Sequence, residues 1–182
     1  MAEMLDISST DIVLDAGCGE GFYLGTLASN AGCAGHGVDI SIPAVDAAAR
    51  RYPRCQWVVA NADRFLPYAT GAFSIVLSIT GRMNPDEFRR VVHPSGRLLV
   101  AVAAPDDLIQ LRGPGRDLVP RTREAFSHKF RLLDQRRATH TADLDRQAVE
   151  DVLLSIYRPL RSEPLRAMRL TFSFDLMLFE PI

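Results

Sequence analysis

The glycine-rich segment DAGCGEG, residues 15–21, is the feature that most limits how this chain can fold. It follows the short β-branched apolar run of residues 11–15 and precedes a helix-like stretch at residues 22–30. Closely spaced glycines allow the backbone to turn tightly and to approach a ligand within contact distance. A buried strand, a glycine turn and a helix in this order predict the first unit of a parallel α/β sheet.

Strand-like and helix-like segments continue to alternate through the first 105 residues. Further strands are predicted at residues 35–40, 56–60, 73–79 and 97–103, and further helices at residues 44–51 and about 85–92. Ser41 and Asn84 stand where the N-caps of these two helices are expected, because their side chains can accept a backbone hydrogen bond. The alternation predicts a doubly wound, mostly parallel sheet.

The pattern changes after Pro105. A segment rich in proline, glycine and arginine, residues 112–123, leads to a predicted strand at residues 130–139. Residues 145–157 have helical spacing, and apolar residues alternate over residues 169–180 as in a long strand. Together these segments predict seven strands, of which the final one is antiparallel.

Polar residues follow the first three predicted strands, whose carboxyl ends meet at one edge of a parallel sheet. The carboxylate of Asp39 ends the second strand and can accept hydrogen bonds from two ribose hydroxyls. The Asn61-Ala62-Asp63 segment follows the third strand and is placed to contact an adenine edge. We therefore predict a nucleoside-binding site that comprises Asp15, Ala16, Gly17, Cys18, Gly19, Gly21, Asp39, Ile40, Asn61, Ala62, Asp63 and Ser78.

Composition excludes several other classes of protein. No run of about 18 apolar residues is present, so no membrane-spanning helix is predicted. The three cysteines form no CxxC pair and the four histidines are scattered, which predicts neither a disulfide framework nor a metal site. Unpaired cysteines are typical of a reducing compartment, and we expect a cytoplasmic protein. The formal net charge of −1 is unlike that of a general nucleic-acid binder.

The segment LDAGCGEGFY, residues 14–23, resembles motif I of S-adenosylmethionine-dependent methyltransferases. Residues 66–68, 73–78 and 91–99 extend the resemblance over the first 105 residues. More narrowly, GCGEGFY and residues 39–41, 47–53, 59–68 and 172–181 are similar to the bacterial 23S rRNA guanine-N1 methyltransferases. The resemblance implies a Rossmann-like methyltransferase fold in which Asp15 and the glycines hold the methionine part of S-adenosyl-L-methionine and Asp39 holds its ribose.

The same resemblance implies one methyltransferase domain over residues 1–182. Residues 1–105 would bind the cofactor, and residues 106–182 would form the substrate side and the terminal strands. Candidate substrate contacts are Thr80, Arg82, Arg112 and Arg116. No catalytic residue is predicted: Asp106 and Asp107 could act as a base, but their position favours the start of a helix.

The methyl acceptor stays open at this stage. Residues 111–137 carry eight basic and three acidic residues, an excess of five positive charges that could attract ribosomal RNA. The 23S rRNA family, however, has a Pro-Cys pair after the fourth strand and a zinc module before motif I, neither of which this sequence contains. A small-molecule methyltransferase and a catalytically silent cofactor-binding module are the alternatives. With ten residues before the first strand, we expect weaker cofactor binding than in longer relatives.

Overall fold

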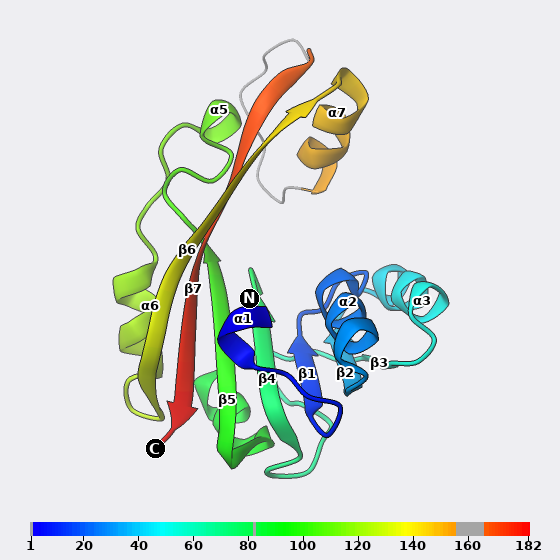
Figure 1. The fold of residues 1–182 in the computed structure, drawn as a ribbon, viewed down its shortest axis with the longest axis vertical. Helices are drawn as coiled ribbons and strands as arrows, with labels where there is room; N and C mark the ends of the chain where they lie inside the picture. Colours follow the sequence, from blue (N-terminus) through cyan, green and yellow to red (C-terminus); the bar gives the residue numbers. More distant parts are fainter. Residues whose placement is uncertain (1, 82, 156–165) are drawn as a thin grey trace.

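The computed structural model describes residues 2–81, 83–155 and 166–182, and seven strands in these residues form one continuous sheet (Figure 1). The strand order is β3-β2-β1-β4-β5-β7-β6. In chain order the strands are β1 Ile12–Ala16, β2 Ala34–Asp39, β3 Gln56–Val59, β4 Phe73–Ile79, β5 Val92–Ala103, β6 Phe130–Leu144 and β7 Met168–Pro181. The helices are α1 Ala2–Leu5, α2 Phe22–Ala31, α3 Ile42–Arg51, α4 Pro85–Val91, α5 Ile109–Arg112, α6 Val119–Phe126 and α7 Arg146–Ser155.

The pairing of the strands confirms the predicted fold class. Strands β1 to β5 pair in parallel, whereas β7 runs antiparallel between β5 and β6. This is a Rossmann-like, seven-stranded sheet with a final antiparallel strand. The carboxyl ends of the five parallel strands therefore lie at one edge of the sheet, which we call the carboxyl edge.

Both faces of the central strands are buried, which explains their unbroken apolar sequences. In β1, Val13 packs in a cluster with Leu24 of α2, whereas the adjacent Leu14 packs on the opposite face with Phe88 of α4 and Phe126 of α6. Successive side chains of a strand point to opposite faces, so each face has its own core. Each fully buried side chain of this size contributes about 1.5–3 kcal/mol to folding.

The two predicted N-caps are confirmed. The Ser41 hydroxyl accepts a hydrogen bond from the amide of Ala44 at 3.4 Å, at the start of α3. The Asn84 side-chain oxygen accepts one from the amide of Glu87 at 3.3 Å, at the start of α4. Such caps stabilise a helix by about 1 kcal/mol each.

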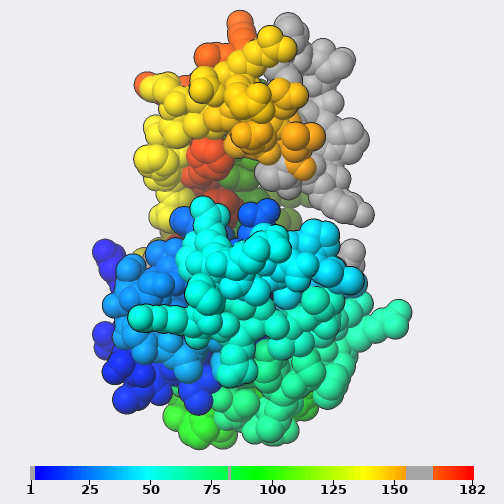
Figure 2. Space-filling view, turned by 90° about the vertical axis from the view of Figure 1, so that its right-hand side faces the viewer, coloured from blue at the N-terminus to red at the C-terminus, as the bar shows by residue number. Residues whose placement is uncertain are grey.

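A two-stranded ribbon extends beyond the carboxyl edge. Strand β7 pairs with β5 only as far as Phe174, whereas its residues 168–173 pair with β6 alone. At about 3.3 Å per residue these six residues reach roughly 20 Å past the end of β5. Figure 1 shows α5 and α7 beside this ribbon, and Figure 2 shows the resulting lobe above the body that carries the first strands.

The projecting lobe has a small core of its own. Leu108, Val149 and Leu170 are buried together, from the turn before α5, from α7 and from β7 respectively. Partly buried side chains surround them: Leu111, Leu144, Val152, Leu153, Met168 and Phe172. The lobe is thus held by a cluster separate from the two cores of the sheet.

Several elements differ from the sequence-based expectation. Helices α1 and α6 were not predicted, and the helix expected to start at Asp106 or Asp107 begins at Ile109 as α5. Helix α6 lies within the proline- and glycine-rich segment, because Pro120 occupies the first turn of a helix, where proline is tolerated. Strand β5 begins at Val92, directly after α4, and β6 extends to Leu144 because β7 pairs with it along its full length. The predicted helix 145–157 corresponds to α7, and residues 156 and 157 lie outside the described residues.

Candidate active site

The glycine segment forms a loop that is tied to the neighbouring strand. The amides of Gly17 and Cys18 both donate to the Val38 carbonyl of β2, at 2.8 and 3.0 Å. Gly21 has a φ of +77°, and a Cβ at this position would overlap the ring of Trp57. Glycine is therefore required here both by the left-handed backbone and by the indole that packs beneath the loop.

Asp39 is fixed against this loop by backbone amides. Its Oδ2 accepts a hydrogen bond from the amide of Gly19, and its Oδ1 accepts one from the amide of Ser41, both at 2.9 Å. Each carboxylate oxygen retains acceptor capacity beyond these single bonds. The structure thus brings together the loop and the acid at the end of β2, as the sequence predicted.

Asp15 lies beneath the same loop and is 1% exposed. Among the described residues its buried Oδ1 has no hydrogen-bond partner. Burial, and then the negative charge of Asp39, raise the pKa of Asp15 to about 7. A buried carboxylate oxygen without a donor is costly unless a ligand supplies one, so the position suits a cationic or hydrogen-bond-donating group.

The charges of Asp15 and Asp39 also act on the thiol of Cys18. Burial, followed by the charges of Asp15 and Asp39, raises the pKa of its thiol to about 12. A thiol of this pKa stays protonated near neutral pH and is a poor nucleophile. Cys18 is therefore a packing residue of the loop.

The segment after β3 reaches the same edge of the sheet. The Asn61 side-chain oxygen accepts a hydrogen bond from the amide of Asp63 at 3.0 Å, which shapes the turn. The Asn84 amide group donates to the carbonyls of Ala62 and Asp63, at 3.2 and 3.0 Å. The cap of α4 therefore also positions the predicted adenine-contacting segment.

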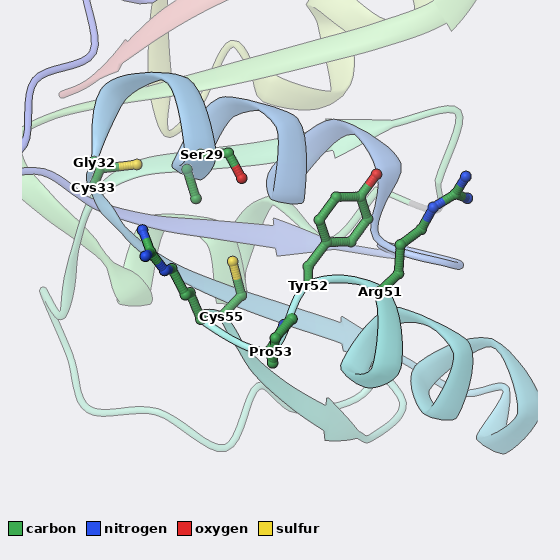
Figure 3. Close-up of a pocket in the computed structure, with 9 residues that line it drawn as sticks. Ser29, Gly32, Cys33, Arg51, Tyr52, Pro53 and Cys55 are labelled. Carbon is green, nitrogen blue, oxygen red and sulfur yellow. The ribbon is translucent and has the colours of Figure 1, made fainter.

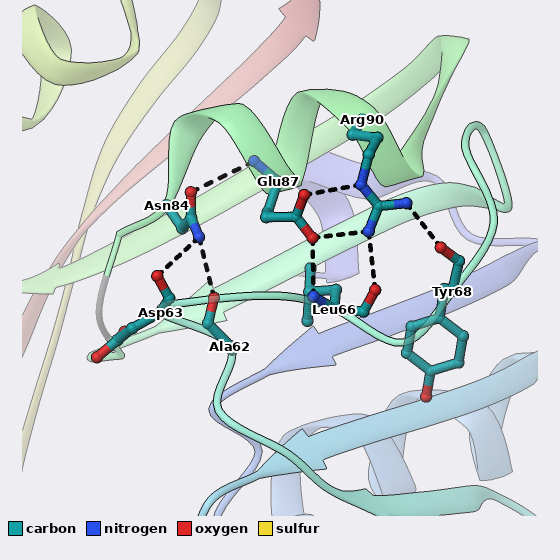
Figure 4. A network of polar contacts seen from close by, with 7 residues as sticks. All are labelled: Ala62, Asp63, Leu66, Tyr68, Asn84, Glu87 and Arg90. Atoms are coloured by element: carbon teal, nitrogen blue, oxygen red, sulfur yellow. Dashed lines mark hydrogen bonds and ion pairs between the residues drawn. The ribbon is translucent and has the colours of Figure 1, made fainter.

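An ion pair holds the chain that follows this segment (Figure 4). Arg90 Nη2 lies 2.6 Å from Glu87 Oε2 and also donates to the Leu66 carbonyl at 2.8 Å, while Nη1 donates to the Tyr68 carbonyl at 2.7 Å. Glu87 accepts the amide of Leu66 at 2.8 Å. The hydrogen bond from Arg90 holds the pKa of Glu87 below its usual value. This network anchors the connection between β3 and β4 on α4.

The remaining predicted contacts lie around the carboxyl edge. Ile40 follows Asp39 and is 67% exposed. Ser78 is buried near the end of β4, while Thr80 is exposed and has a φ of +52°. Arg82 lies outside the described residues.

Most basic residues of the segment 111–137 pair with acids, and four of these acids lie in other parts of the chain. Arg112 lies 3.6 Å from Asp107, and Arg116 is exposed. Five of the eight basic residues form ion pairs: Arg112 with Asp107, Lys129 with Asp86, Arg131 with Glu180, Arg136 with Asp134 and Arg137 with Asp175. In the described residues, Arg116, Arg121 and Arg123 have no such partner. The local excess of positive charge is therefore smaller than the sequence segment alone indicates.

Trp57 and Tyr23 were not predicted as site residues, and Asp107 was considered only as a possible base. The Trp57 ring packs at Gly21, burial and then the charge of Asp15 raise the pKa of Tyr23, and Asp107 lies in the turn before α5 rather than inside a helix. The one sequence feature that points to Asp107 is its position shortly after the carboxyl end of the fifth predicted strand, because functional residues gather at the carboxyl ends of parallel strands. No local pattern indicates the burial of Asp107.

The described residues also enclose a cavity at the opposite edge of the sheet (Figure 3). Its volume is about 220 Å³, and the C-terminal parts of α2 and α3 line it, with Cys33, Arg51, Tyr52 and Cys55 among its residues. It is remote from the glycine loop and contains none of the predicted site residues. No group of three or more metal-binding side chains is found in the part of the chain that the structure describes.

Comparison with known proteins agrees with this geometry. Residues 13–100 match the family described as "Methyltransferase domain". These residues are a methyltransferase domain. A domain of this family and fold uses S-adenosylmethionine as its cofactor.

The relatives and solved structures match more of the chain than the family does. A 23S rRNA (guanine(748)-N(1))-methyltransferase of Streptomyces fradiae is 34% identical over 150 residues, which is 79% of this chain and 54% of the relative. A protein of Micromonospora griseorubida, provisionally named for 23S rRNA guanine-N1 methylation, is 30% identical over 152 residues, 79% of this chain and 51% of that protein. A TehB-like SAM-dependent methyltransferase of Corynebacterium glutamicum has a similar fold, with a TM-score of 0.57, 17% identity and coverage of 94% of this chain and 80% of that one.

The chain spans about half the length of the two curated relatives. The identity to them supports the methyltransferase family, whereas the match to the solved structure supports the fold. None of the helices in the described residues combines the length and the apolar character needed to cross a membrane.

Proposed function

We propose that this chain transfers a methyl group from S-adenosylmethionine to the N1 nitrogen of a guanine in 23S rRNA. The observation that carries the methyltransferase part is the meeting of two acids at the glycine loop: Asp15, whose buried Oδ1 has no partner in the described part of the chain, and Asp39, whose two oxygens are oriented by amides. The relatives named for guanine-N1 methylation support the acceptor.

In this proposal each acid holds one end of the cofactor. Asp15 accepts a hydrogen bond from the ammonium of the methionine part, which pairs its charge. Asp39 accepts hydrogen bonds from the ribose hydroxyls, and Ile40 with the Asn61-Ala62-Asp63 segment borders the adenine. The cofactor supplies one electrophilic methyl group when it is bound. The protein aligns the acceptor with that group and keeps water away.

We further propose that residues 1–182 act as one domain, with residues 1–105 on the cofactor side and residues 106–182 on the acceptor side. The pairing of β5 with β7 joins these two parts within one sheet. Cys18, Cys33 and Cys55 are free and buried, which agrees with a protein of the reducing cytoplasm.

Calorimetry and a methylation assay test the proposal. The chain is titrated with S-adenosylmethionine and, as a control, with NAD, and is then incubated with methyl-labelled cofactor and unmodified 23S rRNA. We expect binding of the first ligand alone and label at N1 of a guanine. Absence of heat with S-adenosylmethionine would overturn the cofactor site, and label in a small metabolite but not in RNA would overturn the acceptor.

One observation favours the small-molecule acceptor as the second candidate. Five basic side chains of residues 111–137 face acids of the same chain, which leaves fewer positive charges for RNA phosphates. The silent binding module has no structural observation in its favour.

A further inference from the structure

Thr80, directly after β4, has a backbone conformation that its own side chain disfavours. In the described part of the chain the non-glycine residues with positive φ are Asp6 at +46°, Leu108 at +49° and Thr80 at +52°. Leu108 is 5% exposed in the core of the lobe, and aspartate adopts this conformation more readily than most residues. Thr80 is β-branched and exposed, so neither packing nor residue type explains its conformation.

The surroundings of Thr80 hold it in this conformation. Its amide donates to the Ala101 carbonyl of β5 at 2.8 Å. The next residue, Gly81, lies against the glycine loop: a Cβ on Gly81 would come within 3.1 Å of the Ala16 carbonyl oxygen and 4.0 Å of Gly17 Cα. The left-handed turn at Thr80 therefore ends β4 and directs the chain onto the loop that follows β1.

This turn places Thr80 at the part of the carboxyl edge that borders Asp15. Asp15 pairs in register with Leu77 of β4, three residues before Thr80. The lobe projects from the same edge (Figure 1). Within the described residues the Thr80 hydroxyl forms no hydrogen bond, although such a group can donate one and accept two. An exposed hydroxyl with free hydrogen-bonding capacity thus follows β4 beside the glycine loop.

We propose that the Thr80 hydroxyl binds the methyl acceptor and that the strained backbone serves to direct this hydroxyl to the place of methyl transfer. The inference rests on the proposed function and names a residue that holds its substrate. In guanine the carbonyl oxygen O6 is adjacent to N1, and a hydroxyl can donate to it. Strain that the surroundings enforce, with no packing that it improves, is typical of functional sites.

The hydrogen bond from Thr80 also has a role in the reaction. Guanine N1 gives its proton to solvent, and the negative charge that remains is shared with O6. The N1 lone pair then forms the new N–C bond, while the C–S bond breaks with its electron pair left on sulfur. A hydrogen bond to charged O6 is stronger than one to neutral O6. The loss of the Thr80 hydroxyl should therefore lower kcat more than it raises KM.

Thermal unfolding tests the strain without any substrate. Glycine adopts positive φ at no steric cost, so Thr80→Gly should raise the melting temperature by about 2–4 °C. Asp6→Gly, at the other exposed position with positive φ, is the matched control and should unfold at the same or a higher temperature with unchanged methyl transfer. A melting temperature of Thr80→Gly at or below that of the wild type would overturn the strain argument.

Methyl transfer to unmodified 23S rRNA at saturating S-adenosylmethionine tests the hydroxyl. Thr80→Val keeps the shape and the β-branch but lacks the hydroxyl, and it should lose at least about tenfold in kcat while cofactor affinity stays within about twofold. Thr80→Ser restores the hydroxyl and should stay within about threefold of the wild type. Because O6 loses its donor in Thr80→Val, the rise of its rate with pH should move to higher pH.

The two measurements on Thr80→Gly separate this role from a structural one, because the variant should be more stable and yet at least about tenfold slower. A purely structural residue would not show gain and loss together. If the wild type methylates guanine and Thr80→Val is equally fast, the role of Thr80 is wrong while the proposed function stands. If the wild type binds the cofactor but methylates no RNA, the proposed function fails and the contact to guanine with it.

Discussion

At the glycine loop, polar side chains are oriented by the backbone: both oxygens of Asp39 accept main-chain amides, and the loop amides donate to the carbonyl of Val38. The projecting lobe, by contrast, also uses pairs of exposed side chains, such as Arg169 with Asp143. Backbone contacts survive most substitutions, whereas contacts between exposed side chains change with one residue and contribute little to stability. The glycine loop can therefore keep a recognisable motif while the projecting lobe varies.

The first test of this contrast removes the charge beneath the loop. Asp15→Asn is expected to weaken S-adenosylmethionine binding by more than about 100-fold, because breaking a buried ion pair costs about 3–5 kcal/mol. Isothermal calorimetry measures the affinity. Asp11→Asn, just before the start of β1, is the matched control and should bind the cofactor normally. A weakening of less than tenfold for Asp15→Asn would show that Asp15 does not pair with the ligand.

The second test removes the core of the lobe. Leu170→Ala is expected to lower the local stability of the ribbon tip and α7 by about 2–4 kcal/mol, the usual cost of a buried leucine. Hydrogen exchange should rise in residues 139–144 and 168–173 while protection of β1 and β4 stays as in the wild type. An equal loss of protection in both regions would show that the lobe and the sheet unfold together.

The third test uses pH. Because the pKa of Asp15 is raised to about 7, this group is mostly protonated below that pH and mostly charged above it in the ligand-free chain. Cofactor affinity should therefore rise up to about tenfold from pH 6 to pH 8 and level off above it, since ligand binding requires the charged form. Calorimetry in buffers of different ionisation enthalpy should detect proton release at pH 6.5. The Asp15→Asn variant should show neither effect.

The raised pKa of Asp15 also makes the folding stability of the ligand-free chain depend on pH, in the direction opposite to that of cofactor affinity. The folded chain binds a proton at Asp15 that the unfolded chain has lost above pH 3.8, so the stability of the ligand-free chain should fall as pH rises from about 4 to about 7. Asp15→Asn should flatten this part of the curve. Thermal unfolding across this range checks the difference between the two proteins, which share every other titrating group.

The smallest effect concerns the basic segment. If only Arg116, Arg121 and Arg123 contact phosphates, the logarithm of RNA affinity should fall with the logarithm of salt concentration with a slope of about 2, rather than the value of about 6 expected for eight contacts. Arg121→Ala and Arg123→Ala should each lower the slope by less than one, and Arg136→Ala, which removes a paired arginine, should leave it unchanged. A slope near 6 would show that the ion pairs open on RNA binding.

The fold was predictable because its signals are local. The apolar runs of β1 and β4, the glycine loop and the caps Ser41 and Asn84 each depend on a few adjacent residues. Helix α6 was missed because its proline and the preceding glycines are typical of loops, although Val119, Thr122 and Phe126 fall on one helical face. The length of the ribbon could not be predicted, since pairing between β6 and β7 depends on residues 24 to 51 positions apart.

By itself the sequence determined the order of the elements, the glycine loop and the acids that face it, because a turn and a strand end are set by neighbouring residues. Only the tertiary structure decided which charged side chains are paired within the chain and which can still contact a ligand. Asp175 and Glu180 neutralise arginines more than 35 positions earlier in the chain, and Ser173 of β7 fixes the carboxylate of Asp107. Electrostatic interactions and burial act through space, so their partners are known only once the strands have been brought together.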